Sequence, residues 1–351
     1  MLAVRHRPGE SSGRGITCLG PFLRGRPVAR LEIRSLNDDL LDGAGRLLAE
    51  RHRAQRRREP ALDKAFEDPT VARQAVASLL TADSVTSLAA VRGGDLLGYL
   101  VGGSRDVDRW GPNVWIEGAG HAGVDGEAVR RLYAAASGDW VAAGRPLHHV
   151  IVPATDEVLL DAWFSMGFGR QHVHGLRDVP GHDFSPAVPA GLVIRMADVD
   201  DLATLASLDL VLVTHQAAAP VFSRARVPTF EETLAELEAE GLADPRFVTF
   251  VAEYDGRVVG SAVGCAIDES SEHAGIVRPP GAGFLGFAAV LPDARGVGAG
   301  RALGETVLAW ARGAGHETIV TDWRSTNVES NRAWLALGFR PIFHRLQRAI
   351  G

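Results

Sequence analysis

The sequence repeats one order of structural signals in its two halves, at an offset of roughly 160–170 residues. A short apolar segment that leads into acidic helix-start residues occurs at residues 33–40 and again at 194–202. A hairpin signal follows in each copy, with turn residues at 92–95 and at 254–257 between β-type runs. Each copy then closes on a helical pattern that ends in Gly-Phe. The repeat predicts two α/β units of similar topology.

Composition suggests where these units begin and end. The chain has 351 residues, of which 46% are apolar, which suffices for two ordinary cores. Residues 1–27 are rich in Gly, Pro and Arg without periodicity, so we expect a flexible extension there. Residues 180–190 are rich in Pro and Gly and predict a linker. The predicted domains are therefore 28–179 and 191–351.

Charge and cysteine content exclude several classes of protein. The net charge of −6 argues against nucleic acid as the main partner, because phosphate contacts require a basic surface. Cys18 and Cys265 are the only cysteines, which is no disulfide framework and fits a reducing cytoplasm. No apolar run reaches the roughly 18 residues of a membrane span, and no signal peptide is evident. We expect a cytoplasmic, bacterial-type monomer or homodimer without a membrane partner.

Residues 284–303 carry the strongest local motif. An apolar strand pattern leads to Pro292, after which Arg295-x-x-Gly298-x-Gly300 opens a helix. Such a turn points several backbone N–H groups at one spot, and the helix N-terminus adds partial positive charge, so the spot suits a phosphate. Glycine is needed because a Cβ would block close approach and positive φ. The alternative is a glycine-rich turn with no ligand.

A second block follows this loop at a fitting distance. It consists of a strand pattern over residues 318–322 and then Asn327-x-x-Ser330-x-x-x-Trp334-x-x-x-Gly338-Phe339. Loop and block together resemble the acyl-coenzyme A site of the GNAT acetyltransferase superfamily, and the repeat resembles a tandem GNAT protein. The resemblance implies an α/β fold of two tandem GNAT domains, each a mixed, mostly antiparallel sheet flanked by helices.

The resemblance also implies an activity and a co-substrate. It implies an N-acetyltransferase that moves an acetyl group from acetyl-coenzyme A to a primary amine of a small molecule, by direct attack in a ternary complex. The implied coenzyme contacts lie on the strand before the loop, on the loop and on the last helix, and are Ala288, Ala289, Val290, Arg295, Gly296, Val297, Gly298, Ala299, Gly300, Arg301, Asn327, Ser330 and Trp334. Loop residues would bind through backbone N–H groups, with Arg301 as a possible ion partner. Asn327 suits a helix N-cap equally well.

The first half differs at the position of the glycine loop. Its sequence there is Gly120-His-Ala-Gly-Val-Asp125-Gly-Glu127, without an equivalent of Arg295. Two carboxylates would repel a diphosphate at close range. We therefore assign the coenzyme to the second half alone. The first half is interpreted as a degenerate copy that supports the fold or shapes the acceptor groove.

The catalytic residues are less well marked. Trp334 stands where the family usually has a tyrosine that protonates the leaving thiolate, and an indole N–H is no proton acid. A packing role is therefore the preferred interpretation of Trp334. Asp322 and His215 are the candidate catalytic bases. The alternatives are a helix cap or an ion pair with Arg324 for Asp322, and a partly buried, hydrogen-bonded imidazole for His215.

Two further points complete the predictions. His172 and His174 alternate on a strand without Cys or acidic partners at ligand spacing, so we predict no metal. Two functional alternatives stay open beside the enzyme. One is an acyl-coenzyme A sensor or pseudoenzyme without turnover, and the other is an interaction protein in which the glycine loop is only a turn.

Overall fold

A computed structural model describes residues 30–107, 111–223, 225–271 and 273–351. The extension predicted over residues 1–27, with Cys18, lies outside the described residues. Leu31–Gly351 form one compact unit. None of the helices in the described ranges is long and apolar enough to cross a membrane.

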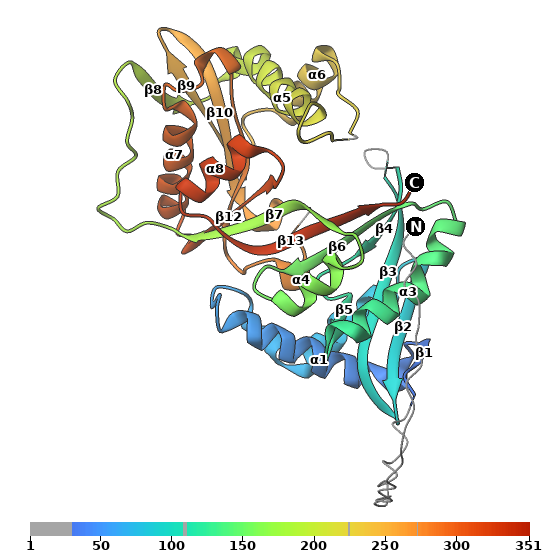
Figure 1. Cartoon of the computed structure of the whole chain (residues 1–351). Coiled ribbons are helices and arrows are strands. Elements are labelled where there is room, and N and C mark those ends of the chain that lie inside the picture. Colours follow the sequence, from blue (N-terminus) through green and yellow to red (C-terminus); the bar gives the residue numbers. More distant parts are fainter. Residues whose placement is uncertain (1–29, 108–110, 224, 272) are drawn as a thin grey trace, which may run out of the picture. The chain divides into compact units, whose positions relative to one another are not determined.

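The first half follows the order of elements that the repeat predicts (Figure 1). Its turn at Gly93 and Gly94, with φ of 61° and 97°, confirms the predicted hairpin. In chain order the elements are β1 (Glu32–Ser35), α1 (Asp38–Arg56), α2 (Pro69–Leu79), β2 (Val85–Arg92), β3 (Asp95–Val107), β4 (Gly111–Ile116), β5 (His121–Gly123), α3 (Gly126–Ala142), β6 (Leu147–Pro153), α4 (Glu157–Phe164) and β7 (Gly169–Asp178).

The second half repeats this order after a connection that contains the predicted linker. Asp255 and Gly256, both at positive φ, form its hairpin turn, which is again as predicted. The elements are β8 (Leu192–Met196), α5 (Leu202–Ala217), α6 (Phe230–Glu240), β9 (Phe247–Tyr254), β10 (Arg257–Ala266), β11 (Gly283–Val290), α7 (Ala299–Gly313), β12 (Thr318–Arg324), α8 (Val328–Ala336) and β13 (Arg340–Ala349).

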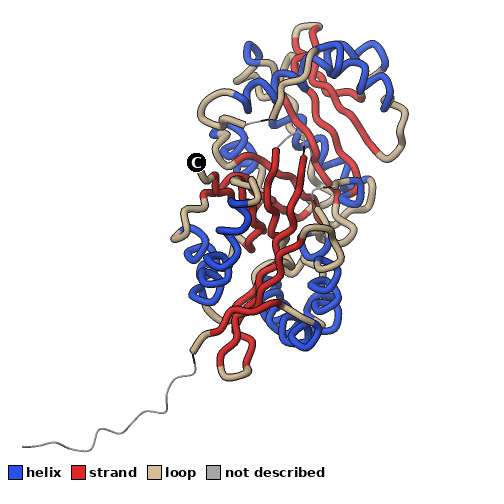
Figure 2. The backbone as a smooth tube through the Cα atoms, turned by 90° about the vertical axis from the view of Figure 1, so that its right-hand side faces the viewer, coloured by secondary structure: helices blue, strands red, loops and turns tan. Residues whose placement is uncertain are grey.

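Strands of both halves form one sheet rather than two separate ones. Among the described residues its order is β1-β2-β3-β4-β6-β13-β7-β12-β11-β10-β9-β8, with β5 paired to β3. Pairing is antiparallel except between β4 and β6 and between β11 and β12. Helices flank the strands (Figure 2). The mixed, mostly antiparallel α/β architecture implied by the resemblance is therefore confirmed.

The two halves exchange their last strands. β7 of the first half lies between β12 and β13, and β13 of the second half lies between β6 and β7. The register places His174 opposite Asp322 and Ile151 opposite Arg345. Each half therefore completes its sheet with a strand from the other, which the repeat in the sequence does not reveal.

Packing also crosses between the halves. One buried cluster joins Leu48 of α1 and Tyr99 of β3 to Ile276 and Val277, which lie in the second half between β10 and β11. A second cluster surrounds α7, and a third lies between α3, α4 and the sheet. The segment between β10 and β11 thus belongs to the core of the first half as much as to its own.

Candidate functional site

The predicted phosphate loop lies between β11 and α7. Gly296 and Gly298 have φ of 95° and 91°, a region that side chains with a Cβ rarely adopt. Gly298 is the N-cap residue of α7, and no side chain of the described residues caps this helix. The first N–H groups of a helix need partners from outside it. Here the protein leaves that end open to a ligand.

Gly300 is not required by the protein's own packing. A Cβ added at Gly300 would lie 3.5 Å from Val290 Cγ2, which is ordinary contact. At Gly298 an added Cβ would come within 2.8 Å of Pro189 Cγ, in the linker. Gly298 is therefore required by its backbone conformation and by the packing of Pro189. Gly300 is required by neither, and its missing side chain leaves space for a ligand to approach the backbone.

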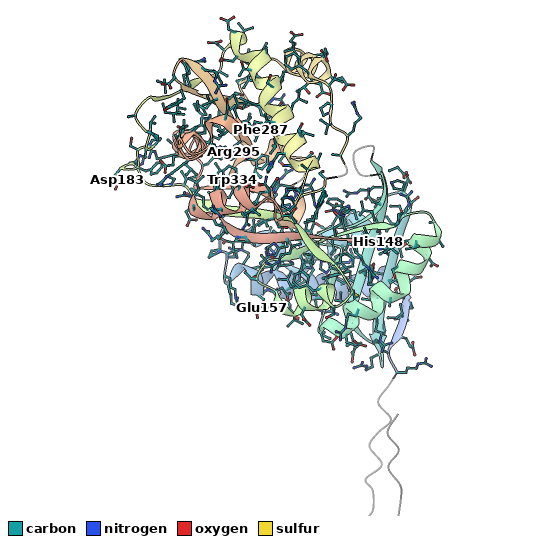
Figure 3. The ribbon with its side chains drawn as sticks, turned by 45° about the horizontal axis from the view of Figure 1, so that its top comes forward. His148, Glu157, Asp183, Phe287, Arg295 and Trp334 are labelled. Carbon is teal, nitrogen blue, oxygen red and sulfur yellow. The ribbon has the colours of Figure 1, made fainter. Side chains whose placement is uncertain are left out.

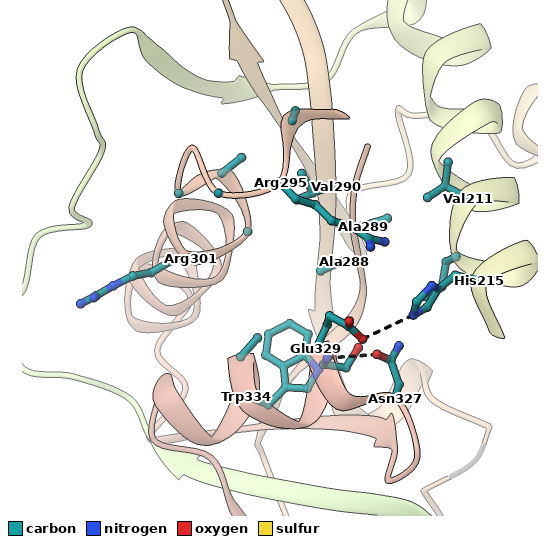
Figure 4. Close-up of a pocket in the computed structure, with 18 of the residues that line it drawn as sticks. Val211, His215, Ala288, Ala289, Val290, Arg295, Arg301, Asn327, Glu329 and Trp334 are labelled. Atoms are coloured by element: carbon teal, nitrogen blue, oxygen red, sulfur yellow. Dashed lines mark hydrogen bonds and ion pairs between the residues drawn. The ribbon is translucent and has the colours of Figure 1, made fainter. Parts of the chain in front are cut away.

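A cavity of about 480 Å³, here called the loop cavity, lies against this loop (Figure 4). Its walls are the end of β11, the loop, α8 and one face of α5. It is lined by every residue of the predicted coenzyme set except Val297: Ala288, Ala289, Val290, Arg295, Gly296, Gly298, Ala299, Gly300, Arg301, Asn327, Ser330 and Trp334. Val297 packs instead against the cluster around α7.

The two arginines of the loop differ in their surroundings. The guanidinium of Arg295 has no hydrogen bond or ion pair with any described residue, and its side chain extends along the cavity (Figure 4). Arg301 points away from the cavity, and its Nε donates to Glu305 Oε1 at 2.7 Å. Arg295 is thus the better placed cation for a phosphate.

Residues of α8 form the opposite wall. Asn327 caps the helix, since its Oδ1 accepts from the Ser330 N–H at 3.2 Å, and it also lines the cavity. Trp334 is 9% exposed and packs edge-on against Phe339, with ring centroids 5.9 Å apart. His215, near the end of α5, lies 3.8 Å from Glu329, and both line the loop cavity.

A second cavity of about 530 Å³ opens where β11 and β12 diverge, and we call it the strand cavity. The two strands pair only over residues 283–285 and 319–321 in the described structure. Gly286 follows as the extra residue of a β-bulge, which re-aims β11. Beyond it, alternate N–H groups of β11 point to the side that β12 has left. Figure 3 shows Phe287 of this wall in the same part of the fold as Arg295 and Trp334.

The two cavities adjoin. Leu212, Ala288, Ser330 and Trp334 line both of them. A ligand seated against the glycine loop and extending along β11 therefore reaches the edge of the strand cavity. Two molecules held in the two cavities would meet near Ala288 and Trp334.

The strand cavity carries more carboxylates than cations. Its acidic lining residues are Asp209, Glu236, Glu269 and Asp322, against Arg324 and Arg345. His172 from β7, a strand of the first half, also lines it. The excess of negative charge favours a positively charged ligand.

Asp322 faces His172 across the exchanged strands. His172 Nε2 lies 2.9 Å from Asp322 Oδ1. Burial opposes ionisation of Asp322, but the adjoining His172, with His273 and His174, outweighs it and lowers the pKa of the carboxyl group. Asp322 and His215, the two predicted bases, line different cavities. His172 was noticed in the sequence only as half of a His-x-His pair, because its partner is 150 residues away.

In the first half, the protein's own groups occupy the positions that correspond to the two cavities of the second half. Asp125 caps α3, with its Oδ1 accepting from the Ala128 N–H at 2.8 Å. Arg51 of α1 donates to the carbonyl groups of Gly118 and His121, beside the end of β4. A Cβ at Gly118 would lie 2.8 Å from Val277 Cγ2 of the second half. The helix end and the strand end that form cavities in the second half are occupied here.

The described residues contain no group of three or more His, Cys, Asp or Glu side chains arranged to hold a metal ion. The histidines near Asp322 pack instead as aromatic rings. His172 and His174 have centroids 5.9 Å apart, and His174 and His273 have centroids 4.7 Å apart.

Comparison with known sequences agrees with this geometry. The acetyltransferase (GNAT) family matches residues 215–339, which carry both predicted bases and the glycine loop. An aminoglycoside N(6')-acetyltransferase type 1 from Stenotrophomonas maltophilia is 32% identical over 124 residues, which cover 34% of this chain and 78% of that protein.

Similarity in fold to a solved structure extends over most of the chain. A GCN5-related N-acetyltransferase from Sphaerobacter thermophilus superposes with a TM-score of 0.56 at 15% identity, covering 91% of this chain and 95% of that one. A tandem GNAT protein from the clavulanic acid biosynthesis pathway covers 92% of this chain and 99% of its own, with a TM-score of 0.47 and 18% identity. Because the sequence identity is only 15%, the superposition on the Sphaerobacter thermophilus structure shows the fold alone.

Proposed function

Since the chain belongs to the GNAT acetyltransferase family, we propose that its second half transfers an acetyl group from acetyl-coenzyme A to a primary amine of a small, cationic molecule. The observation that carries the proposal is the pair of adjoining cavities, one beside an open helix N-terminus and the other lined by carboxylates. Two sites that meet allow both substrates to bind together and react by direct attack.

Three features of the loop cavity suit the coenzyme. The N–H groups at the start of α7 have no side-chain cap among the described residues, and Gly300 leaves room for close approach. A diphosphate bound there would accept hydrogen bonds from these N–H groups and face the guanidinium of Arg295, which has no partner among the described residues. The mainly aliphatic wall from Ala288 to Val290 suits the long arm that joins the diphosphate to the thioester.

The strand cavity suits the amine. Its carboxylates attract an ammonium group and any further positive charge on the same molecule. The aminoglycoside acetyltransferase that is 32% identical acts on a small molecule of this kind, which supports the same class of acceptor here. Which amine is accepted depends on the shape of the cavity between α5, α6 and β11.

Different residues of the chain have different roles in the proposed reaction. Acetyl-coenzyme A supplies an acyl group activated as a thioester. N–H groups of β11 beyond the Gly286 bulge polarise its carbonyl oxygen, an effect worth a few kcal/mol in acyl transfer. Asp322 holds the acceptor ammonium and removes its proton, with His215 as the alternative base. Trp334 has no acidic proton, so the thiolate leaves unprotonated or takes its proton from water.

We assign no coenzyme to the first half. Asp125 already supplies the cap for its α3, so a phosphate would have to displace a carboxylate and then bind beside it. We keep two domains, 28–179 and 191–351, as the proposed division of the chain, with β7 and β13 exchanged between them.

The test is a thiol-release assay with acetyl-coenzyme A and four amines of different classes: neamine, glucosamine, spermidine and tyramine. We expect turnover to be fastest with a polycationic acceptor. In parallel, acetyl-coenzyme A at 100 times its dissociation constant should stabilise the protein by about 2.7 kcal/mol. Stabilisation without turnover of any amine would favour the sensor, to which Trp334 already points. If acetyl-coenzyme A neither stabilises the protein nor is turned over, the glycine loop is only a turn.

A further inference from the structure

We propose that the hydroxyl group of Ser330, in the first turn of α8, donates a hydrogen bond to the sulfur atom of the coenzyme as the thiolate leaves. The inference rests on the proposed function and deepens it. Trp334 cannot protonate this thiolate, so its negative charge has to be stabilised in another way. The hydroxyl group makes Ser330 a catalytic residue and not only a part of the coenzyme cavity.

Ser330 lies where the two cavities adjoin. The residues that line both cavities are Leu212, Ala288, Ser330 and Trp334. Of these four, only Ser330 and Trp334 carry a side-chain group that can donate a hydrogen bond. The thioester has to lie at this junction, because its arm comes from the loop cavity and the amine comes from the strand cavity. The sulfur atom and the Ser330 hydroxyl group therefore meet in the same place.

The geometry of a helix brings residues 330 and 334 to one spot. Ser330 and Trp334 are four residues apart on α8 and so lie on the same face of this helix. A long side chain on a helix leans toward the N-terminus and covers the turn that precedes it. The space that a side chain at position 334 reaches is therefore also within reach of the short side chain of Ser330. Because the ring of Trp334 is committed to packing against Phe339, Ser330 is the donor left for a ligand.

The hydroxyl group of Ser330 is not used by the protein. The backbone N–H of Ser330 donates to Asn327 Oδ1 at 3.2 Å, which fixes the start of α8. The Oγ atom makes no hydrogen bond with any described residue. A serine in a helix can turn its hydroxyl group to the carbonyl of the preceding turn, as Ser207 does to Ala203 at 3.0 Å. Ser330 is half-buried at the cavity wall and keeps its donor for a ligand.

The surroundings of Ser330 also favour a negative charge on sulfur. The first turn of a helix carries the positive end of the helix dipole, and Ser330 belongs to the first turn of α8. Glu329 in the same turn has the opposite effect. Its side chain is 63% exposed and lies 3.8 Å from His215, so solvent screens much of its charge. The hydrogen bond from Ser330 is the short-range contribution, and it acts on the atom that becomes charged.

The bonds and protons of this step balance without a further reactant. Attack by the neutral amine forms one C–N bond, and the C–S bond breaks with its electron pair left on sulfur. Ser330 keeps its proton throughout, because a hydroxyl group of this kind donates a hydrogen bond and does not ionise. An ammonium acceptor loses two protons in all, one before the attack and one after it. The released thiolate takes up one proton from solvent to become the free thiol.

Ser330→Ala in the full-length protein is the critical variant. It removes the hydroxyl group alone, and alanine is a good helix former, so α8 is retained. Ser207→Ala is the matched control. It also removes one serine hydroxyl group from a helix, but Ser207 is exposed on α5 and lines neither cavity.

The first measurement is made on bound coenzyme A and needs no turnover. The ultraviolet absorbance of its thiolate, followed from pH 6 to 10, gives the pKa of the bound thiol. Desulfo-coenzyme A, which lacks the sulfur atom, gives the background of the protein. We expect this pKa to be about one unit higher in Ser330→Ala than in the unchanged protein, since one unit corresponds to a tenfold loss of thiolate stabilisation.

The second measurement is the single-turnover rate with acetyl-coenzyme A and the fastest of the four amines, which isolates the chemical step. We expect Ser330→Ala to lower this rate about tenfold. The thermal shift by acetyl-coenzyme A should stay as in the unchanged protein, because the sulfur atom of the thioester carries no charge. Ser207→Ala should change none of the three quantities.

Three results would overturn the inference. A single-turnover rate of Ser330→Ala within about threefold of the unchanged protein would show that the hydroxyl group takes no part in catalysis. An unchanged pKa of the bound thiol would show that it does not contact the sulfur atom. A lost thermal shift would assign Ser330 to coenzyme binding instead.

Failure of the proposed function looks different from failure of this inference. If the unchanged protein turns over none of the four amines, the proposed function fails, and the catalytic role of Ser330 with it. Turnover by the unchanged protein together with an unaffected Ser330→Ala removes the role of Ser330 alone.

Discussion

Glu59, just after α1, holds Arg340, the first residue of β13, through two hydrogen bonds of 2.6 and 2.7 Å. Glu59 is 4% exposed, and this pairing raises the pKa of Arg340. The contact joins the segment that follows α1 to the strand that the second half contributes to the first. It therefore fixes the exchanged strand at its starting point.

Replacing Glu59 by alanine should lower the free energy of unfolding by about 1–2 kcal/mol. The loss stays below the 3–5 kcal/mol typical of a broken buried pair, because the Arg340 side chain is 42% exposed and water can solvate its charge. Urea unfolding at pH 7.5 measures the difference. Glu127→Ala is the control. Glu127 pairs with Arg130 and Arg131 on the surface, so its removal should lower the free energy of unfolding much less than the removal of Glu59. Equal losses would contradict the assignment.

Arg295→Glu should weaken acetyl-coenzyme A binding about 10–100-fold, because a charge-assisted contact is lost and a carboxylate is placed near the diphosphate. Arg295 has no partner among the described residues, so we expect the free energy of unfolding to change little. Isothermal titration calorimetry gives the dissociation constant. Arg131→Glu makes the same change of charge on the exposed face of α3 and should leave the affinity unaltered. Unchanged binding by Arg295→Glu would refute the coenzyme site.

Gly300→Ala should change stability and affinity in opposite directions. Without ligand, alanine in the first turn of α7 should stabilise the protein by up to about 1 kcal/mol, because the added Cβ makes only ordinary contact. Binding of acetyl-coenzyme A should weaken about tenfold or more, because the Cβ occupies the approach to the backbone. Urea unfolding and calorimetry on one sample give both quantities.

Gly313→Ala, at the other end of α7, is the control for this pair of effects. A Cβ there meets no atom within 4 Å, so helix stability should rise while affinity stays constant. If Gly300→Ala behaves in the same way, no ligand lies against Gly300.

Stability should fall as the pH drops below about 6.5, because several histidines are buried in the neutral state. The Nε2–H of His121 donates to the Ile151 carbonyl at 2.9 Å, and the ring lies edge-on to Trp163. Burial, and then the charge of Arg51, lower the pKa of His121 to about 3. Below pH 6.5 the unfolded chain binds a proton that the folded protein does not, so this part of the stability is full above pH 6.5 and is lost as the pH falls toward 3.

At pH 5 the contribution of His121 to this loss is about 2 kcal/mol. His121→Gln should therefore reduce the difference in unfolding free energy between pH 7.5 and pH 5.0 by that amount, as measured in urea. His182→Gln, an exposed histidine in the linker, should leave the difference as it is. A His121→Gln protein with the full pH dependence would show that the imidazole is not kept neutral by the fold.

The sequence predicted those features that depend on neighbours along the chain. The hairpins at Gly94 and Gly256 follow from short turn signals, and the loop at Gly296 and Gly298 follows from residues that tolerate positive φ. The N-cap role of Asn327 was one of two alternatives, and the structure bears it out. The family's fold could be inferred because these local signals recur in a fixed order.

Features that depend on pairing between distant strands could not be predicted. Nothing local in β7 indicates that it pairs with β12 rather than within its own half, since antiparallel strands of similar pattern are interchangeable until the packing is known. The contact of His172 with Asp322 follows from that pairing and was missed with it. The pairing of Arg301 with Glu305 was also missed, although the i, i+4 spacing on a helix could have indicated it.

The exchange of β7 and β13 bears on how the protein is made. β6 needs β13 at its side, and residues 340–349 leave the ribosome long after β6 does. Domains that emerge first usually fold first during synthesis, but the first half keeps an open sheet edge until β13 has been synthesised. A chain that stops shortly before Arg340 would thus leave both halves unfinished, including the one translated in full.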